Sequence, residues 1–272
     1  MLGSSKIIVK KDKNRMPSWD PAQYAQFAAE RARPCRDLIA AIAVESPERI
    51  ADLGCGPGNS AAMLADRWPA VQLLGIDTSS EMLEAARATN QHARFEQSQI
   101  EEWAEQSGQW DVVFSNAALQ WVPHHESIFP QLMHRVSPGG ALAVQMPADM
   151  QAPAHVVARE LAASPEWSTR FATSPIGWQA HSAGFYYDAL SPQAKRLDIW
   201  KTDYFHSLPS VESVTEWYRG SGLRPYLDAL RTLSARNEFL AQYTERLRSE
   251  YSLRNDGRVL LPFTRIFVVA YS

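Results

Sequence analysis

The sequence is poor in cysteine and has no long apolar run. Its 272 residues include two cysteines, Cys35 and Cys55, too few for a disulfide framework, which fits a reducing compartment. No stretch of about 18 consecutive apolar residues occurs, so no membrane span is predicted. Residues 1–15 are basic but lack the apolar core of a signal peptide, so a cytoplasmic protein is expected. This segment is either a functional basic tail or, as we expect, a disordered extension.

An excess of positive charge is also absent. The formal net charge is −3, which gives no electrostatic case for a nucleic-acid partner. Hydrophobic residues make up 45% and charged residues 21% of the chain, the ordinary composition of a globular protein with a buried core. No internal repeat occurs, no metal site is predicted, and the sequence leaves the oligomeric state open.

What the chain does contain is an alternation of short apolar runs with helical patterns. The runs that we expect to form strands are 49–53, 71–76, 94–97, 111–115 and 141–146. Helices are expected over 19–43, 59–68 and 79–89, and after Pro123. Strands that alternate with helices of about ten residues predict βαβ units, a parallel sheet, and helices on both faces of that sheet.

The pattern changes after Pro147. Residues 148–185 and 210–253 are expected to be helical, and 197–208 and 258–271 to supply two more strands. We therefore predict an α/β fold with a doubly wound, seven-stranded, mostly parallel sheet and helical insertions that cap a substrate site. We divide the chain into an extension (1–15), a cofactor-binding core with an N-terminal helical cover (16–147), and a region with the cap and the last two strands (148–272).

A glycine-rich loop follows the first predicted strand. Gly54-Cys55-Gly56-Pro57-Gly58 has the spacing G-x-G-x-G and stands between a strand and a helix. Glycine lets a ligand lie against the backbone and permits positive φ, and the helix N-terminus offers free N–H groups. A dinucleotide site favours G-x-G-x-x-G instead. The shorter loop, with Asp52 just before it, resembles the pattern of adenosylmethionine enzymes, and the alternative is a simple tight turn.

Asp77 ends the second predicted strand. A carboxylate at that place can accept hydrogen bonds from both hydroxyls of a ribose. The alternative is an ordinary acidic residue at a helix N-terminus, because Ser79 and Ser80 follow. Because the glycine loop precedes it in the chain, we favour the ribose role for Asp77.

This strand plan resembles the class I S-adenosylmethionine-dependent methyltransferase family over residues 49–147. The resemblance implies S-adenosyl-L-methionine as cofactor and S-adenosyl-L-homocysteine as product. It implies that Gln99, where the family commonly has Asp, meets the adenine amine, that the backbone of Ile100 meets the ring, and that Asn116 faces the methionine part. The expected cofactor residues are Asp52, Gly54, Cys55, Gly56, Asn59, Asp77, Thr78, Met82, Gln99, Ile100 and Asn116.

The chain also resembles, over nearly its whole length, the trans-aconitate 2-methyltransferase family. The matching segments include Trp19-Asp20-Pro21-x-x-Tyr24, Asn116-Ala-x-Leu-Gln-Trp121, Tyr186-Tyr187-Asp188 and Gly222-Leu-Arg-Pro-Tyr226. This resemblance implies that one carboxylate of a small unsaturated tricarboxylic acid is converted to its methyl ester.

Such a trianion needs cations and hydrogen-bond donors, and the arginine fork suits carboxylates. The substrate-orienting candidates are Tyr24, Arg33, Trp121, His181, Tyr186, Tyr187 and Arg224. For each arginine the alternative is an ordinary surface or structural ion pair, and for Trp121 it is a place in the core.

No general base is predicted, because a carboxylate is already ionised at neutral pH. The reaction would be an in-line displacement at the sulfonium methyl, to which the protein contributes orientation. His124 and His125 are better explained by the start of a helix after Pro123. Two other hypotheses stay open: a carboxyl methyltransferase for a malonyl thioester on an acyl carrier protein, and a non-catalytic adenosylmethionine-binding protein.

Overall fold

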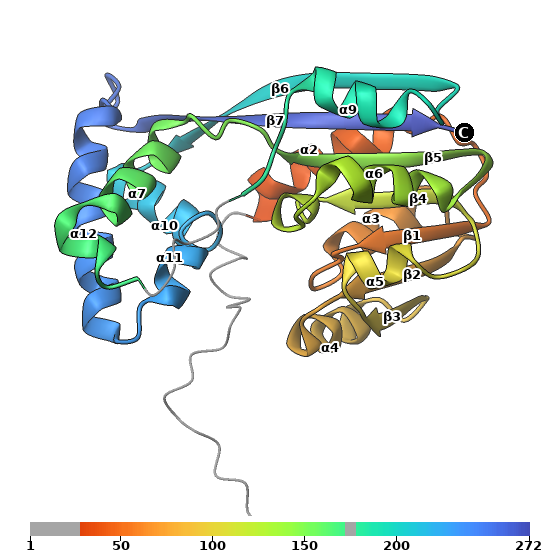
Figure 1. Ribbon diagram of the computed structural model, residues 1–272, viewed down its shortest axis with the longest axis horizontal. Helices are drawn as coiled ribbons and strands as arrows, with labels where there is room; N and C mark the ends of the chain where they lie inside the picture. Colours follow the sequence, from red (N-terminus) through yellow and green to blue (C-terminus); the bar gives the residue numbers. More distant parts are fainter. Residues whose placement is uncertain (1–27, 172–177) are drawn as a thin grey trace, which may run out of the picture.

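The structure, a computed structural model, describes residues 28–171 and 178–272 (Figure 1). Its strands are β1 (Arg49–Leu53), β2 (Gln72–Asp77), β3 (Ala93–Gln97), β4 (Trp110–Asn116), β5 (Val136–Pro147), β6 (Arg196–Leu208) and β7 (Val259–Tyr271). The helices that cover the sheet are α2 (Ala28–Ala41), α3 (Asn59–Arg67), α4 (Ser80–Thr89), α5 (Ile100–Ala104), α6 (His125–His134) and α9 (Ala183–Leu190), and η1 (Leu119–Trp121) is a short 3₁₀ turn. The remaining helices are α7 (Pro153–Ala163), α8 (Pro165–Ser168), α10 (Val211–Arg219), α11 (Arg224–Ala229) and α12 (Leu233–Glu250).

The seven strands form one sheet in the order β3-β2-β1-β4-β5-β7-β6. The first five strands are parallel to one another. Strand β7 runs antiparallel to both of its neighbours, β5 and β6. The prediction of a doubly wound, mostly parallel, seven-stranded sheet is therefore confirmed.

Apolar side chains cover both faces of the sheet. On one face, α2, α3 and α4 contribute Leu38, Leu64 and Leu83 to a buried cluster. On the other, α6 and α9 contribute Phe129 and Tyr186 to a second cluster. Strands buried on both sides read as continuous apolar runs, which explains why 49–53 and 111–115 stand out in the sequence.

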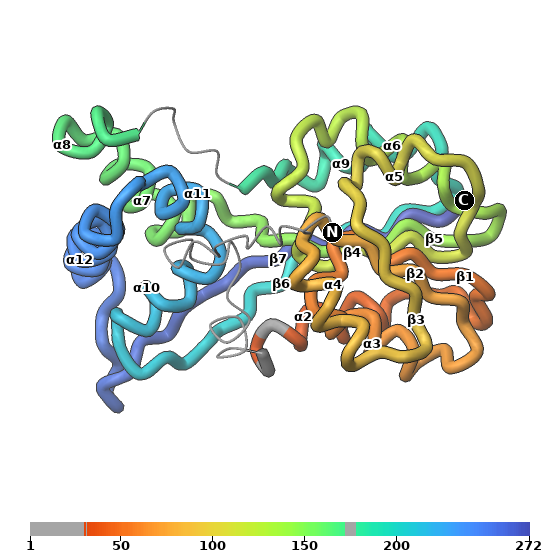
Figure 2. Tube along the Cα trace, turned by 90° about the horizontal axis from the view of Figure 1, so that it is seen from below, coloured from red at the N-terminus to blue at the C-terminus, as the bar shows by residue number. Residues whose placement is uncertain are grey.

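Strands β6 and β7 extend beyond the sheet. The pairing of β7 with β5 stops at Arg265, whereas its pairing with β6 continues to Val259. The projecting part of this hairpin joins the helices α7, α8, α10, α11 and α12, here called the cap, as the two views show (Figures 1 and 2). The cap has its own apolar core, in which Trp167, Phe239 and Tyr243 are fully buried.

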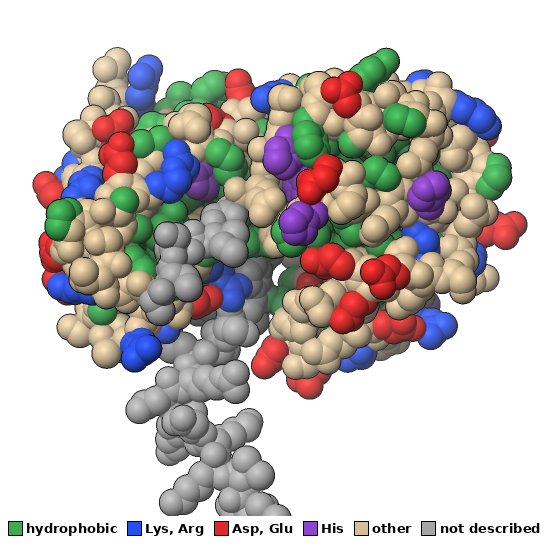
Figure 3. Space-filling model, in the orientation of Figure 1, with side chains coloured by type: hydrophobic (Ala, Val, Ile, Leu, Met, Phe, Trp, Pro, Cys, Tyr) green, Lys and Arg blue, Asp and Glu red, His purple; other side chains and the backbone are tan. Residues whose placement is uncertain are grey.

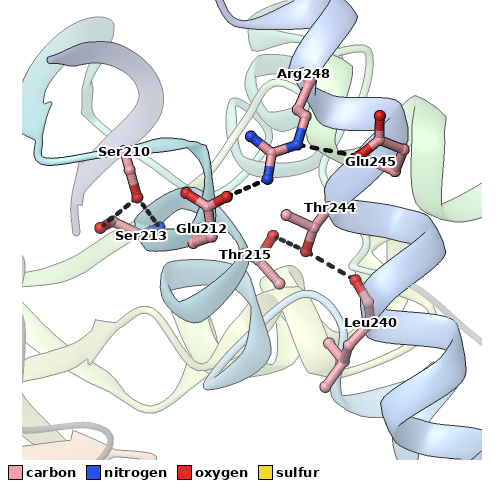
Figure 4. Close-up of polar contacts among 8 residues, drawn as sticks. All are labelled: Ser210, Glu212, Ser213, Thr215, Leu240, Thr244, Glu245 and Arg248. Carbon is pink, nitrogen blue, oxygen red and sulfur yellow. Dashed lines mark hydrogen bonds and ion pairs between the residues drawn. The ribbon is translucent and has the colours of Figure 1, made fainter. Parts of the chain in front are cut away.

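Polar contacts fasten two helices of the cap to each other (Figure 4). Thr215 of α10 and Thr244 of α12 lie with their hydroxyl oxygens 2.8 Å apart, and the Thr215 side chain is buried. Nearer the surface, Arg248 forms an ion pair with Glu212. The side chain of Ser210 caps α10 by accepting from the backbone N–H of Ser213, at 3.4 Å.

One predicted helix is confirmed over its described part, and the structure departs from the prediction in two other places. The predicted helix 19–43 is a helix over its described part, α2, while residues 19–27 lie outside the described residues, as does the predicted extension 1–15. The helical segment 148–185 was expected to belong to the cap. Instead, α9 begins at Ala183 and packs against α6 and the sheet, because Tyr186 and Leu190 lie in the core cluster on that face. The short helix α5 was not predicted at all.

Within residues 28–171 and 178–272, no helix is long and apolar enough to cross a membrane.

Candidate active site

A cavity of about 580 Å³ opens where the carboxyl ends of β1, β2 and β4 face the cap. In Figure 3 the surface is hollowed between the sheet domain and the cap. Crevices at the carboxyl ends of parallel strands are the usual ligand sites of open α/β sheets. Ten of the predicted cofactor residues line this cavity, namely Gly54, Cys55, Gly56, Asn59, Asp77, Thr78, Met82, Gln99, Ile100 and Asn116.

The glycine loop packs tightly on one side and is open on the other. A Cβ added to Gly54, whose φ is +71°, would lie 2.2 Å from the Cβ of Ala118. A Cβ added to Gly56, whose φ is +54°, would meet nothing within 4 Å. The first glycine therefore permits close packing of two loops, and the second leaves bare backbone at the floor of the cavity.

Asp77 holds this loop from the end of β2. Its Oδ2 accepts from the backbone N–H of Gly56, and its Oδ1 accepts from the backbone N–H of Ser79, both at 2.9 Å. Each carboxylate oxygen has further lone pairs for a ligand. The two interpretations of Asp77 from the sequence are thus compatible, because the residue organises the start of α4 and also lines the cavity.

The next wall comes from the start of α5. Gln99 precedes the helix, and its Nε2 donates to Oε1 of Glu102 at 2.8 Å. Ile100 is the first residue of α5, where backbone N–H groups have no partner within the helix. Met82 of α4 is buried beside the same cavity. This end offers backbone donors and an apolar surface, as an adenine ring requires.

A row of polar side chains crosses the sheet at the far wall. Nη1 of Arg265 in β7 donates to Oε1 of Gln145 in β5, at 3.0 Å. Nε2 of Gln145 donates to Oδ1 of Asn116 in β4, at 2.5 Å. All three residues line the cavity. After Asn116 the chain turns sharply, since Ala117 has a φ of 56°, a conformation that non-glycine residues seldom adopt.

The cap closes the cavity with a cation and with aromatic rings. Arg224 of α11 lines it and forms an ion pair with Asp228 at 3.7 Å. Trp178, Trp217 and Phe263 also line it, and each is at least nine-tenths buried. Trp121 faces them from η1, with its ring centroid 5.9 Å from that of Trp178. Its exposed fraction of 39% shows that it belongs to the cavity wall rather than to the core.

Asp52 does not line the cavity. It is completely buried behind the glycine loop, where its Oδ2 accepts from the hydroxyl of Ser60 at 2.6 Å. Burial raises the pKa of Asp52 to about 7. Its place is structural, since it ties the end of β1 to the first turn of α3.

Four of the described substrate-orienting candidates, Arg33, His181, Tyr186 and Tyr187, are also not among the residues that line the cavity. The exposed Arg33 guanidinium lies over the ring of Tyr204, at 5.2 Å. Tyr187 is 55% exposed on α9, and the ring of His181 stacks on Phe185 at 4.1 Å. Tyr24 lies outside the described residues. Of the seven candidates, the structure brings Trp121 and Arg224 to the cavity.

Tyr186 and His125 form a buried hydrogen bond with each other. Nε2 of His125 lies 2.9 Å from the carbonyl oxygen of Leu119, which can only accept, so this nitrogen carries the proton. Nδ1 then accepts from the Tyr186 hydroxyl, at 2.9 Å. Burial lowers the pKa of His125, which favours the neutral ring that this pairing needs. His125 begins α6 and His124 is its N-cap, so both histidines serve the start of the helix, as expected.

Sequence reasoning missed Arg265 and Gln145. Both are buried, with exposed fractions of 6% and 1%, and both stand in strands that read as core. A signal was present, because a cation directly before the apolar run Ile266–Ala270 must have a reason to be buried. No group of three or more His, Cys, Asp or Glu side chains suited to a metal ion occurs in the described residues.

Comparison with known proteins agrees with this geometry. A family model described as a methyltransferase domain matches residues 50–140. A trans-aconitate 2-methyltransferase of Rhodopseudomonas palustris (strain BisB18) is 44% identical over 256 residues, which make up 94% of this chain and 99% of that protein. One of Yersinia pestis (strain Pestoides F) is 43% identical over 258 residues, again 94% of this chain and 99% of that protein.

Solved structures share the fold at much lower identity. The YcgJ protein from Bacillus subtilis has a TM-score of 0.60 at 14% identity and covers 89% of this chain and 98% of its own. Phosphoethanolamine N-methyltransferase 2 of Haemonchus contortus, in complex with S-adenosyl-L-methionine, has a TM-score of 0.52 at 14% identity and covers 88% of this chain and 52% of its own. With more than two-fifths identity over nearly its whole length to the curated relatives, the chain belongs to the trans-aconitate 2-methyltransferase family of class I methyltransferases.

Proposed function

We propose that this chain transfers a methyl group from S-adenosyl-L-methionine to one carboxylate of trans-aconitate, or of a closely similar small polycarboxylate, and forms the monomethyl ester. One observation carries the proposal. A single cavity has the glycine loop and Asp77 on one wall and two arginines, Arg224 and Arg265, among the residues of the others. The names of the curated relatives support the choice of acid.

The residues present fit the cofactor. Gly56 leaves an open floor, the oxygens of Asp77 have lone pairs for the ribose hydroxyls, and the N-terminus of α5 has a backbone donor for the adenine ring. When bound, S-adenosyl-L-methionine supplies an electrophilic methyl group on a positively charged sulfur.

The arginines fit the acid. A tricarboxylate has two carboxylates that do not react, and Arg224 and Arg265 offer two guanidinium forks to hold them. The reacting carboxylate must be left without a cation, because pairing would blunt its nucleophilicity. Holding the spectator groups orients the third one for in-line attack, which is the main contribution that a protein can make to such a displacement.

The reaction needs no general base in the cavity. No histidine, lysine or tyrosine occurs among the described residues that line it. A carboxylate is ionised at neutral pH and is a nucleophile without proton transfer. Trp121, Trp178 and Trp217 give the cavity an apolar wall, and an apolar surrounding favours the loss of charge when an anion attacks a cationic centre.

The charge at the rim argues against an acyl carrier protein as the bearer of the carboxylate. Acidic side chains gather over α4 and α5 beside the hollow (Figure 3), and the sequence places Glu81, Glu84, Glu101, Glu102 and Glu105 there. An acidic carrier protein docked on this surface would be repelled by it.

The proposal is tested by incubating the purified protein with methyl-labelled S-adenosyl-L-methionine and a panel of di- and tricarboxylic acids. We expect a base-labile methyl ester on trans-aconitate and much less on saturated or shorter acids. Label that forms only on a malonyl-loaded acyl carrier protein would replace this substrate. Cofactor binding without transfer to any acid or carrier would leave a binding protein.

A further inference from the structure

The two hydrogen bonds of the row Arg265–Gln145–Asn116 both run in the same direction, with each residue donating to the next. A guanidinium can only donate hydrogen bonds, so the side-chain oxygen of Gln145 must face Arg265. The amide nitrogen of Gln145 then faces Asn116, and the side-chain oxygen of Asn116 must face Gln145. The orientation of both amides therefore follows from the arginine, which can only donate.

This orientation determines what the side-chain nitrogen of Asn116 can do. Its oxygen is engaged by Gln145, and no hydrogen bond joins its Nδ2 to another of the described residues. Asn116 lines the cavity, so this NH₂ group is the polar function that it offers to a ligand.

The backbone holds Asn116 in this place. Asn116 and Gln145 are direct partners in the pairing of β4 with β5. The N–H of Ala117 donates to the carbonyl oxygen of Gln145 at 2.8 Å, and Ala117 takes up a positive φ directly after it. A side chain fixed at both its backbone and its oxygen is preorganised to donate.

We propose that Arg265, acting through Gln145, fixes Asn116 as a hydrogen-bond donor to a carboxylate in the cavity. The proposal deepens the proposed function and rests on it for the ligands concerned. Two carboxylates would be present in the working enzyme, one on the acid substrate and one on the methionine part of the cofactor. The same chemistry serves both, and the experiment separates them. In this scheme Gln145 is a positioning residue.

The first variant reverses the row. Gln145→Glu places an acceptor where the amide nitrogen stood, so Asn116 must turn its NH₂ group to the new carboxylate and its oxygen to the cavity. The introduced charge stays paired with Arg265, so folding is expected to survive. Calorimetry measures the binding of S-adenosyl-L-homocysteine, and then the binding of trans-aconitate to that complex, so no turnover is required.

We expect one of the two dissociation constants to rise by about tenfold to a hundredfold, the usual range for a charge-assisted hydrogen bond lost. A rise for S-adenosyl-L-homocysteine assigns Asn116 to the methionine carboxylate. A rise for trans-aconitate assigns Asn116 to the substrate when the uncharged variant Asn116→Leu raises the same constant, because the new carboxylate of Gln145→Glu also engages Arg265, which is proposed to hold the acid. A rise for trans-aconitate in Gln145→Glu that Asn116→Leu does not reproduce would overturn the proposal. Unchanged constants for both would overturn the proposal. Gln151→Glu is the matched control, because Gln151 also accepts from an arginine, Arg159, but lies outside the cavity.

A second pair of variants tests whether Gln145 acts through Asn116 or touches the ligand itself. Gln145→Leu removes the row without adding charge, and Asn116→Leu removes its end. If Gln145 only orients Asn116, adding Gln145→Leu to Asn116→Leu changes the affected constant by no more than about twofold. Fully additive losses would mean that Gln145 binds the ligand directly, and the row would be wrong.

The experiments distinguish a failure of this proposal from a failure of the proposed function. A protein that binds both ligands but forms no methyl ester would sink the proposed reaction and leave the row intact. Conversely, an active enzyme in which Gln145→Glu binds both ligands normally would sink the row alone.

Discussion

Gly54 and Ala118 lie so close that a Cβ on the glycine would stand 2.2 Å from the Cβ of the alanine. This contact joins the loop after β1 to the turn after β4 beneath the cavity. We expect Gly54→Ala to lower the free energy of unfolding by about 1–3 kcal/mol through overpacking, with added strain from its positive φ. The double variant Gly54→Ala with Ala118→Gly should recover the part due to the clash. Thermal unfolding measures both, and a double variant no better than the single one would show that strain alone is responsible.

Asp77 supports both the glycine loop and a ligand. The Asp77 carboxylate accepts hydrogen bonds from two backbone N–H groups. In Asp77→Asn one of these donors would face the NH₂ group of the amide and lose its acceptor. We expect the affinity for S-adenosyl-L-homocysteine to fall by about tenfold or more, as measured by calorimetry. The control is Asp66→Asn, a change at an exposed carboxylate on α3. Equal affinities for the two variants would contradict the ribose role.

Arg224 is expected to act on the acid and not on the cofactor. Its removal in Arg224→Ala should raise the KM for trans-aconitate by about tenfold to a hundredfold, while the affinity for S-adenosyl-L-homocysteine stays within about twofold. Arg224→Lys should recover part of the loss, since it keeps the charge without the fork. Arg246→Ala, an exposed arginine on α12, is the control. A parallel loss of cofactor affinity would mean that α11 shapes the whole cavity.

Asp52 makes stability depend on pH. Its pKa in the folded protein, about 7, lies above the ordinary value of an aspartate, so the folded state holds a proton that the unfolded state has released. Stability therefore falls as pH rises from about 4 to about 7, by at most about 1.4 kcal/mol for each pH unit. Asp52→Asn removes this titration and can keep the hydrogen bond from Ser60.

Urea unfolding at pH 5, 6, 7 and 8 checks the effect of Asp52. The wild type should lose more stability over this range than Asp52→Asn, and the difference between the two curves removes the contribution of the buried histidines. Curves that stay parallel would place the carboxylate in an environment where it ionises normally.

The fastening of α10 to α12 can be weakened without touching the cavity. Thr215→Val keeps the shape of the side chain but removes its hydrogen bond to Thr244. We expect a loss of about 1 kcal/mol and a Tm lower by roughly 2–4 °C. Thr169→Val, at an exposed position after α8, gives the baseline. A Tm no lower than that baseline would show that packing alone joins the two helices.

The parallel part of the fold was predictable because its signals are local. Each of β1, β2 and β4 is an apolar run that ends in a loop, and the glycine spacing after Leu53 names the kind of loop. Helix α5 was not predicted because its five residues, Ile100–Ala104, are too few to show a helical period.

The walls of the cavity were less predictable because they depend on tertiary pairing. Tyr186 looked like a substrate ligand, but α9 turns it onto the sheet and against His125. Arg265 looked like one more residue of a terminal strand, and its place at the cavity follows only from the pairing of β7 with β5. The periodicity of a sequence does not show which residues of two distant strands pair with each other, whereas it does show where a single loop lies.

The long hairpin of β6 and β7 has a consequence for biogenesis. Strand β7 inserts between β5 and β6 and also reaches the cap, so residues Val259–Tyr271 are shared by both halves of the molecule. During synthesis the earlier parallel strands can assemble as they emerge, but the sheet and the cap both wait for this late segment. We therefore expect the sheet and the cap to reach their final structure together, once Val259–Tyr271 has paired, and not domain by domain.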